Sequence, residues 1–312
     1  MRQFPVADGH CDTAYELLRR NEPLRRNSGH ISLEQAEKLP RYWQFFAFWT
    51  ELPPAGVSEA AWFRQMYQNL TAQLEQNRDC VRLCTTGTEV RQAWVRGKLV
   101  ASFSMEGTGA IASEPARLEE LYQLGIRMIS LTWNAANPLA GSYITGEGLS
   151  VRGREFVRRA QRLGMLIDVS HLSERAFWDL CDVTEGPIMA SHSNARAVCG
   201  HGRNLSDAQF REICSSGGTA GINLYRAFLV DGGKARFDDV QRHLEHFLDL
   251  GGEDHLALGG DLDGCHDLPL GFADVADYNR LAEFLQNAGF SESLLEKIYY
   301  KNLMRVVMAC NM

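Results

Sequence analysis

Histidine and carboxylate residues recur in this sequence where short apolar segments end. The first pair stands in Asp8-Gly9-His10-Cys11-Asp12. Side chains alternate along a strand, so residues two apart point the same way, and His10 and Asp12 can bind one ion together. The other members of the set each follow a later apolar segment: Glu106, His171, His192 and Asp261. Imidazole and carboxylate ligands of this kind suit zinc, with manganese or cobalt as substitutes.

Each of these residues also has a purely structural interpretation when it is taken alone. A histidine beside a strand end is more often a cap or a hydrogen-bonded core residue, and Gly259–Gly264 (GGDLDG) can simply form a turn. Their common position favours the metal interpretation, because unpaired carboxylates buried at strand ends would be costly. The sequence therefore predicts a metal site at one end of a sheet.

Formal charges favour two ions over one. Two divalent cations bring +4, whereas Asp12, Glu106 and Asp261 bring −3 and a bridging hydroxide brings −1, so the sum is zero. A pair of ions lowers the pKa of a bridging water and polarises a carbonyl. Neither ion needs Asp261 as a ligand, so we expect it to carry the proton to a leaving amine, with Asp263 as the alternative.

Short segments rich in β-formers alternate with stretches of helical periodicity, and these elements must position the site. We predict eight strands, over residues 6–13, 43–49, 99–106, 126–134, 165–171, 187–193, 218–225 and 256–263. We predict helices over residues 59–77, 117–124, 152–163, 174–181, 206–215 and 237–250. Ser173 and Ser206 stand where N-caps belong, and Gly125, Gly164, Gly217 and Gly251 follow helices as stops.

This alternation predicts βαβ units and a parallel sheet. Eight units predict an α/β fold, a (β/α)8 TIM-like barrel, in one domain over residues 1–312. The alternative is an open doubly wound sheet of fewer strands, because residues 43–49 could also form a buried helix. In a barrel, the predicted ligands converge at the carboxyl ends of the strands, where barrel enzymes have their active sites.

Composition narrows the classes of partner. The chain has 312 residues and a formal charge of −7, which argues against nucleic acid and anionic membranes as partners. No apolar run approaches the roughly 20 residues that a bilayer requires, and the amino terminus lacks the pattern of a secretory signal. The eight scattered cysteines contain no CxxC pair and are typical of reduced thiols. We therefore expect a cytoplasmic protein.

In their order and spacing, the motifs resemble those of the renal or membrane dipeptidase family of binuclear zinc peptidases, peptidase family M19. The resemblance extends over nearly the whole chain, to residues 302–306 (NLMRV). It is carried by residues 8–12 (DGHCD), 166–173 (LIDVSHLS), 191–193 (SHS) followed by Cys199 and Arg203-Asn204, and 259–264 (GGDLDG).

The resemblance implies a (β/α)8 barrel of the metal-dependent hydrolase type with two zinc ions. It implies that His10 and Asp12 bind the first ion, His171 and His192 bind the second, and Glu106 bridges both. It also implies that Asp261 handles the proton. Arg203 would bind the substrate carboxylate, and its planar fork suits that bidentate role.

The sequence departs from the family at one position. Family members with dipeptidase activity carry a histidine in the fourth-strand motif, where this chain has Leu131-Thr132-Trp133-Asn134. That histidine is thought to contact the substrate carbonyl or its oxyanion, whereas Trp133 can donate one hydrogen bond but carries no charge. Losing one oxyanion donor costs on the order of 10²–10³ in rate. Either Asn134 or the metal takes over, or the substrate differs. We predict that Trp133, Asn134 and Tyr225 line the substrate pocket.

Three functions are compatible with these residues. The leading hypothesis is a zinc dipeptidase that cleaves a dipeptide with a metal-bridging hydroxide. The alternative is a related metal-dependent amidase, deacylase or lactam hydrolase on the same binuclear centre. The third is a non-catalytic barrel, which the mixture of histidines and carboxylates disfavours because structural zinc sites are usually cysteine-rich. The resemblance also suggests a homodimer. His243 and His246 fall outside every strand-end motif and are assigned no role.

Overall fold

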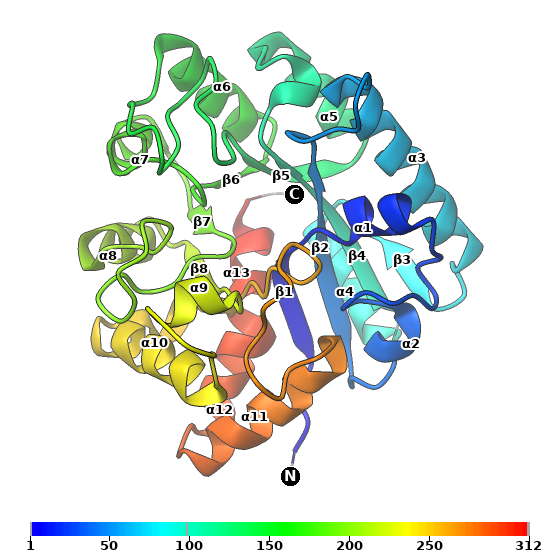
Figure 1. Ribbon diagram of the computed structural model, residues 1–312, viewed down its shortest axis with the longest axis vertical. Helices are drawn as coiled ribbons and strands as arrows, with labels where there is room; N and C mark the ends of the chain where they lie inside the picture. Colours follow the sequence, from blue (N-terminus) through cyan, green and yellow to red (C-terminus); the bar gives the residue numbers. More distant parts are fainter. Residues whose placement is uncertain (1, 98, 311–312) are drawn as a thin grey trace.

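The strands form a closed parallel barrel with helices around it (Figure 1). The structure is a computed structural model, and it describes residues 2–97 and 99–310. Its eight barrel strands are β1 (Val6–Cys11), β2 (Tyr42–Trp49), β4 (Leu99–Glu106), β5 (Ile126–Ser130), β6 (Leu166–Asp168), β7 (Ile188–Ala190), β8 (Thr219–Ile222) and β9 (Leu256–Leu258). Their order is β2-β1-β9-β8-β7-β6-β5-β4, and β4 pairs back with β2 to close the ring. The predicted (β/α)8 barrel is confirmed.

The segment that could have been a buried helix is a strand. In β2, Trp43 and Phe45 join the barrel interior, where the indole nitrogen of Trp43 donates to Ser102 Oγ of β4 at 3.0 Å. Phe48 faces outward and packs edge-on against Phe63 of α3 (Glu59–Gln76), with ring centroids 5.3 Å apart. Because β2 is buried on both faces, its sequence is almost entirely apolar, with Gln44 as the exception, which is typical of parallel strands.

The short strand β3 (Val81–Leu83) was not predicted. It pairs with the first residues of β4, and β5 takes over the same edge of β4 from Phe103 onward. Only Val81 in this strand is fully buried, so its sequence carries no alternating pattern. The strand extends the sheet outside the closed ring.

The helices surround the barrel, and α13 lies against its amino-terminal end, where Leu303, Val306 and Val307 are buried among interior residues. Their bounds are α1 (Thr13–Arg20), α2 (Leu33–Ala36), α3 (Glu59–Gln76), α4 (Gly87–Val95), α5 (Leu118–Gln123), α6 (Val151–Arg162), α7 (Glu174–Cys181), α8 (Asp207–Ser215), α9 (Arg226–Leu229), α10 (Phe237–Asp249), α11 (Tyr278–Asn287), α12 (Glu292–Glu296) and α13 (Asn302–Ala309). Within the described part of the chain, no helix combines the length and hydrophobicity needed to cross a bilayer.

The six predicted helices are all present, and their ends differ from the predicted ones by one residue at most. Ser173 and Ser206 accept hydrogen bonds from the backbone N–H groups of Ala176 and Gln209, so both predicted N-caps are confirmed. The four predicted stop glycines have φ angles between 78° and 89°. The sequence did not predict several other helices, among them α1, α4, α11 and α13.

Several strands end earlier than the sequence predicted. The prediction extended β6 to residue 171 and β9 to residue 263, whereas these strands end at Asp168 and Leu258. His171 and Asp261 have φ angles of 70° and 57°, in the left-handed region that a strand cannot contain. These two residues therefore lie on turns that follow the strands.

Two glycines allow β8 and β9 to approach the chain after β7. A Cβ atom at Gly221 or Gly259 would lie 2.1 or 1.8 Å from the carbonyl oxygen of Ser191. Neither position can hold a side chain unless the backbone moves. Gly259 opens the segment that carries Asp261, so this close packing fixes where that segment leaves the barrel.

We expect Gly259→Ala to lower the free energy of unfolding by roughly 3 kcal/mol, because the new methyl group overpacks a rigid backbone contact. Chemical denaturation measures this change. Gly232→Ala is the control, since a Cβ atom there meets no atom within 4 Å. Equal stability of the two variants would contradict the packing argument.

Candidate metal centre

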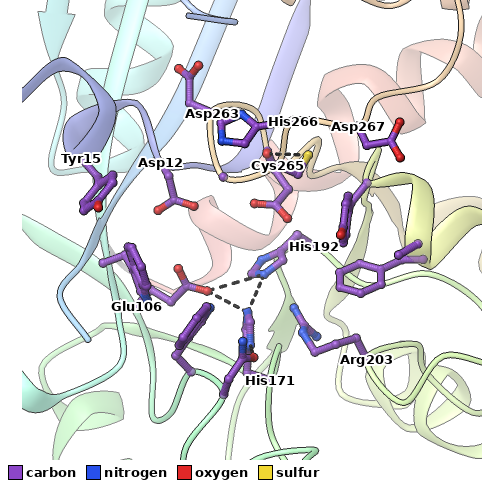
Figure 2. A pocket seen from close by; sticks show the side chains of 18 of the residues that line it. Asp12, Tyr15, Glu106, His171, His192, Arg203, Asp263, Cys265, His266 and Asp267 are labelled. Carbon is purple, nitrogen blue, oxygen red and sulfur yellow. Dashed lines mark hydrogen bonds and ion pairs between the residues drawn. The ribbon is translucent and has the colours of Figure 1, made fainter. Parts of the chain in front are cut away.

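The predicted ligand side chains gather at the carboxyl ends of the strands, around a cavity of about 810 Å³ (Figure 2). Residues that line it include Asp12, Glu106, His171, His192 and Asp261. His10 is buried beside them, with its Nε2 atom 3.6 Å from a carboxylate oxygen of Glu106. The structure therefore brings together all six residues that the sequence singled out.

One group of ligand atoms consists of two imidazoles and one carboxylate oxygen. His171 Nε2 lies 2.8 Å from Glu106 Oε1 and 3.0 Å from His192 Nε2. His192 Nε2 lies 3.7 Å from the same Glu106 oxygen. Figure 2 shows these three side chains pointing toward one another. A divalent ion would have three ligands here.

A second group lies on the other side of Glu106. His10 Nε2 is 3.6 Å from Asp12 Oδ2, 3.6 Å from Glu106 Oε2 and 4.0 Å from Asp261 Oδ1. The two oxygens of Glu106 thus face two different ligand groups. Asp261, expected to be unnecessary as a ligand, has a carboxylate oxygen within 4.8 Å of the ligand atoms of His10 and Asp12.

The chemistry of these groups fits a pair of divalent cations. His10 Nε2 and Asp12 Oδ1 are buried without a hydrogen-bond partner in the described chain. Burial alone would lower the pKa of His10, but Glu106, Asp12 and Asp261 outweigh it and raise this pKa to about 10. Positive charge is therefore favoured at this point, and a metal ion would supply it.

The remaining two histidines have the protonation state that metal binding requires. Burial lowers the pKa of His171 and of His192 well below the usual value. Both imidazoles are therefore neutral near pH 7 and can each offer one nitrogen lone pair. Burial also raises the pKa of Glu106 well above its usual range, which shows how costly this carboxylate is without a cation.

Asp8 holds the first strand and the segment carrying Asp261 in register. Its carboxylate accepts the backbone N–H groups of His10 at 2.9 Å and Gly260 at 3.0 Å, and the Tyr278 hydroxyl also donates to it. Asp8 is fully buried. These bonds fix the segments that carry His10 and Asp261 relative to each other.

Asp263, the alternative to Asp261, serves a different purpose. Its carboxylate accepts the Thr13 hydroxyl at 2.6 Å and the backbone N–H of His30 at 2.6 Å. Figure 2 shows it pointing away from His171 and His192. Asp261 instead faces His10, and its other oxygen accepts from Asn223 Nδ2 at 3.1 Å. The geometry favours Asp261 as the proton-handling residue.

Arg203 is a buried cation without a carboxylate partner in the described chain. Its Nε and Nη2 atoms have no hydrogen-bond partner there, and Nη1 donates only to Ser193 Oγ at 3.4 Å. The guanidinium lies 5.9 Å from the ring centroid of Tyr143 and 5.5 Å from that of Phe228. Burial lowers the pKa of Arg203. An unpaired buried charge is costly, so this arrangement suits an anionic ligand.

Trp133, Asn134 and Tyr225 all line the cavity, as expected. The Trp133 ring packs on Trp49 with centroids 4.8 Å apart, and its backbone N–H donates to Glu51 at 3.0 Å. Asn134 Oδ1 accepts from His171 Nδ1 at 3.1 Å. Asn134 therefore orients a ligand histidine. Tyr225 packs edge-on against Phe228, with ring centroids 5.0 Å apart.

His243, assigned no role from the sequence, supports the segment that follows His192. Its Nδ1 atom accepts the backbone N–H of Ala195 at 3.1 Å, and its Nε2 donates to the carbonyl of Leu229 at 3.1 Å. It is a polar residue on the buried face of α10, between Val240 and Leu244. A polar residue on the apolar face of an amphipathic helix was the sequence signal that could have identified this role. Tyr143, Phe228 and Asn223 were also missed, because only the folded chain brings them to the site.

Comparison with known proteins gives a consistent result. The family described as "Membrane dipeptidase (Peptidase family M19)" matches residues 1–311. A metallo peptidase from Rhodobacter sphaeroides, crystallised with a phosphinate mimic of the dipeptide L-Ala-D-Ala, is 29% identical with a TM-score of 0.91, and the match covers 99% of this chain and 100% of that one. The crystal structure of dipeptidase AC, a metallo peptidase of family M19, is 30% identical with a TM-score of 0.91 and 99% of each chain covered. An uncharacterized dipeptidase of Schizosaccharomyces pombe is 29% identical over 98% of this chain and 81% of its own length.

The stability of the fold should fall in acid because of His243. Burial lowers its pKa to about 4 from 6.5, so the unfolded chain binds a proton that the folded chain rejects between these values. The contribution of His243 to the free energy of unfolding is therefore fully present above pH 6.5. It is lost as the pH falls toward 4, by up to about 1.4 kcal/mol per pH unit. Denaturation in excess chelator, at a series of pH values, measures the slope. His243→Gln should show a shallower slope than the unmodified chain, and identical slopes would contradict this assignment.

Proposed function

The chain belongs to the membrane dipeptidase family, peptidase family M19, and on this basis we propose that it is a zinc dipeptidase that hydrolyses the single peptide bond of a dipeptide. The observation that carries the proposal is Glu106, whose two oxygens face separate groups of buried ligand atoms. Two zinc ions, when bound, would supply a bridging hydroxide as nucleophile and polarise the substrate carbonyl. Manganese or cobalt can substitute for zinc.

The ligand assignment follows the two groups. His10 and Asp12 would hold one ion, His171 and His192 would hold the other, and Glu106 would contact both. The formal charges of these carboxylates, two divalent ions and a hydroxide nearly cancel, which supports two ions.

Arg203 would orient the substrate. A dipeptide bound across the centre has its terminal carboxylate one residue beyond the scissile bond, and Arg203 offers two unpaired N–H-bearing nitrogens in the same cavity. Tyr143 and Phe228 flank the guanidinium and keep it desolvated. A longer peptide would place a neutral amide against this buried charge. The arrangement therefore favours dipeptides.

Asp261 would transfer the proton to the leaving amine. Burial raises its pKa to about 6, which allows the carboxyl to hold a proton near neutral pH. Asn223 binds one carboxylate oxygen, so the other oxygen stays directed toward the ligand groups. Holding the carboxyl in one orientation shortens the path of the proton.

The packing of Trp133 on Trp49 supports a second candidate function. Where the family carries a histidine, this chain has an apolar wall of two indoles beside the ligand groups. A substrate with an apolar acyl group, cleaved by an amidase, deacylase or lactam hydrolase, would fit such a wall.

We expect the purified protein to contain about two metal ions per chain and to lose its activity on chelation. Asp261→Asn should retain the metal and lose turnover on the order of 10²-fold or more, since general acid catalysis contributes about that much. Elemental analysis and turnover on one sample measure both quantities.

The substrates used in these turnover measurements should include dipeptides with L- or D-residues at the second position, and N-acyl amino acids. Turnover of only the N-acyl compounds would replace the dipeptidase assignment with the second candidate, and absence of metal would overturn both.

The role of Arg203 predicts a specific change in substrate preference. Arg203→Gln should lower kcat/KM for a dipeptide on the order of 10²-fold, because the variant loses a desolvated charge pair. The same variant should change little toward the matching dipeptide amide, which has no carboxylate. Arg211→Gln, at an exposed position of α8, is the matched control. An equal loss on both substrates would exclude carboxylate binding by Arg203.

A further inference from the structure

We propose that Asp168 is a positioning residue that acts through the Ser191 hydroxyl to fix the ring tautomer of His192, so that His192 presents an unprotonated Nε2 to the ligand group. The inference rests on the proposed function only where it concerns metal binding. The tautomer itself is a property of the chain without any ion.

Asp168 ends β6 and is almost completely buried. Its Oδ1 accepts the backbone N–H groups of Ser170 at 3.0 Å and Ser191 at 2.9 Å. Its Oδ2 accepts the hydroxyls of Ser130 at 2.7 Å and Ser191 at 2.6 Å. Four donors therefore surround this carboxylate, and they come from the ends of β5, β6 and β7.

These bonds exclude a different interpretation of the same carboxylate. Asp168 lies close enough to His10 and His192 for the three to be considered a metal-binding group. A carboxylate has about four lone-pair positions, and hydrogen bonds account for all four here. Asp168 therefore supports the ligand groups and has no free position for an ion.

The direction of the hydrogen bonds fixes the proton on His192. Ser191 Oγ lies 2.6 Å from His192 Nδ1 and 2.6 Å from Asp168 Oδ2. An ionised carboxylate can only accept, so the single hydroxyl proton of Ser191 points to Asp168. Ser191 Oγ must then accept from His192, which places the imidazole proton on Nδ1. The lone pair is on Nε2.

The ligand group shows the consequence of this arrangement. His171 Nδ1 donates to Asn134, so the Nε2 of His171 is also unprotonated. The two Nε2 atoms, both acceptors, lie 3.0 Å apart and close to Glu106 Oε1. Such a convergence of buried acceptors is costly without a partner, and a bound cation would compensate for it. His192 differs from His171 because a carboxylate stands behind it, which makes it the more basic ligand.

Asp168→Asn reverses the chain of hydrogen bonds. The amide that replaces Oδ2 donates to Ser191, the Ser191 hydroxyl turns toward His192 Nδ1, and the imidazole proton moves to Nε2. Nitrogen-15 NMR of the metal-free protein with labelled histidine distinguishes the two tautomers, and the signal of His192 is assigned by its loss in His192→Gln. We expect the Nδ1–H tautomer in the unmodified chain and the Nε2–H tautomer in Asp168→Asn. An Nε2–H tautomer in the unmodified chain would overturn the proposal.

Ser130 and Ser191 both donate to Asp168 Oδ2, so their alanine variants form a matched pair. This comparison still tests the proposal if Asp168→Asn does not fold. Ser191→Ala removes the link to His192, whereas Ser130→Ala removes an equivalent hydroxyl that does not touch a ligand. Titration with zinc should show one of two ions bound about 10–100-fold more weakly in Ser191→Ala. Ser130→Ala should bind both ions as the unmodified chain does. Equal losses in the two variants would show a merely structural role for Asp168 and overturn the proposal.

The two measurements fail independently. If the unmodified chain binds no metal, the proposed function fails, while the NMR measurement on the metal-free protein still decides the tautomer. If metal binding and dipeptide turnover are present but the tautomer is Nε2–H, only the role of Asp168 is overturned.

Discussion

Burying a carboxylate costs several kcal/mol unless hydrogen bonds or a cation compensate for it, and one end of this barrel buries a cluster of them. Asp8 and Asp168 are compensated by N–H and O–H donors from neighbouring strand ends. Among the described residues, Asp12 and Glu106 have no comparable set of donors. Buried carboxylates therefore perform two tasks here. Those surrounded by hydrogen-bond donors hold neighbouring segments in place and form the framework, whereas those with few donors are the candidate metal ligands.

The framework carboxylates use one pattern twice. Asp8 accepts the backbone N–H two residues ahead and the N–H of Gly260 in the segment following the adjacent strand β9. Asp168 does the same with Ser170 and with Ser191 after β7. In both places the bond joins two segments that carry candidate site residues, His10 and Asp261 in the first case and His171 and His192 in the second. The parallel barrel brings adjacent strand ends together, and a buried carboxylate then fixes their relative position to within a hydrogen bond.

The sequence predicted the barrel and the convergence of the candidate ligands because both depend on local patterns. Eight apolar segments predict the strands, and histidines and carboxylates at the ends of five of them predict one shared site without knowledge of the contacts. The ends of β6 and β9 were placed too late, since the apolar pattern continues while His171 and Asp261 turn the backbone into the left-handed region. The partners of Arg203 could not be predicted, because Tyr143 lies in the loop between β5 and α6, whereas Phe228 lies in α9, far away in sequence. Asp168 was visible in its motif, but its function depends on the direction of a hydroxyl proton across two strands.

The electrostatic design separates two kinds of positive charge in one cavity. The carboxylates attract cations to one region, whereas Arg203 is itself an unpaired cation, buried between aromatic rings. An ion pair between Arg203 and Glu106 or Asp261 would neutralise both, yet no carboxylate of the described chain lies within ion-pair distance of the guanidinium. Holding these groups apart keeps the carboxylates free for metal and the guanidinium free for an anion. A substrate that joins an electrophilic carbonyl to a carboxylate can satisfy both regions at once, and the fixed distance between them limits how many residues lie between those two groups.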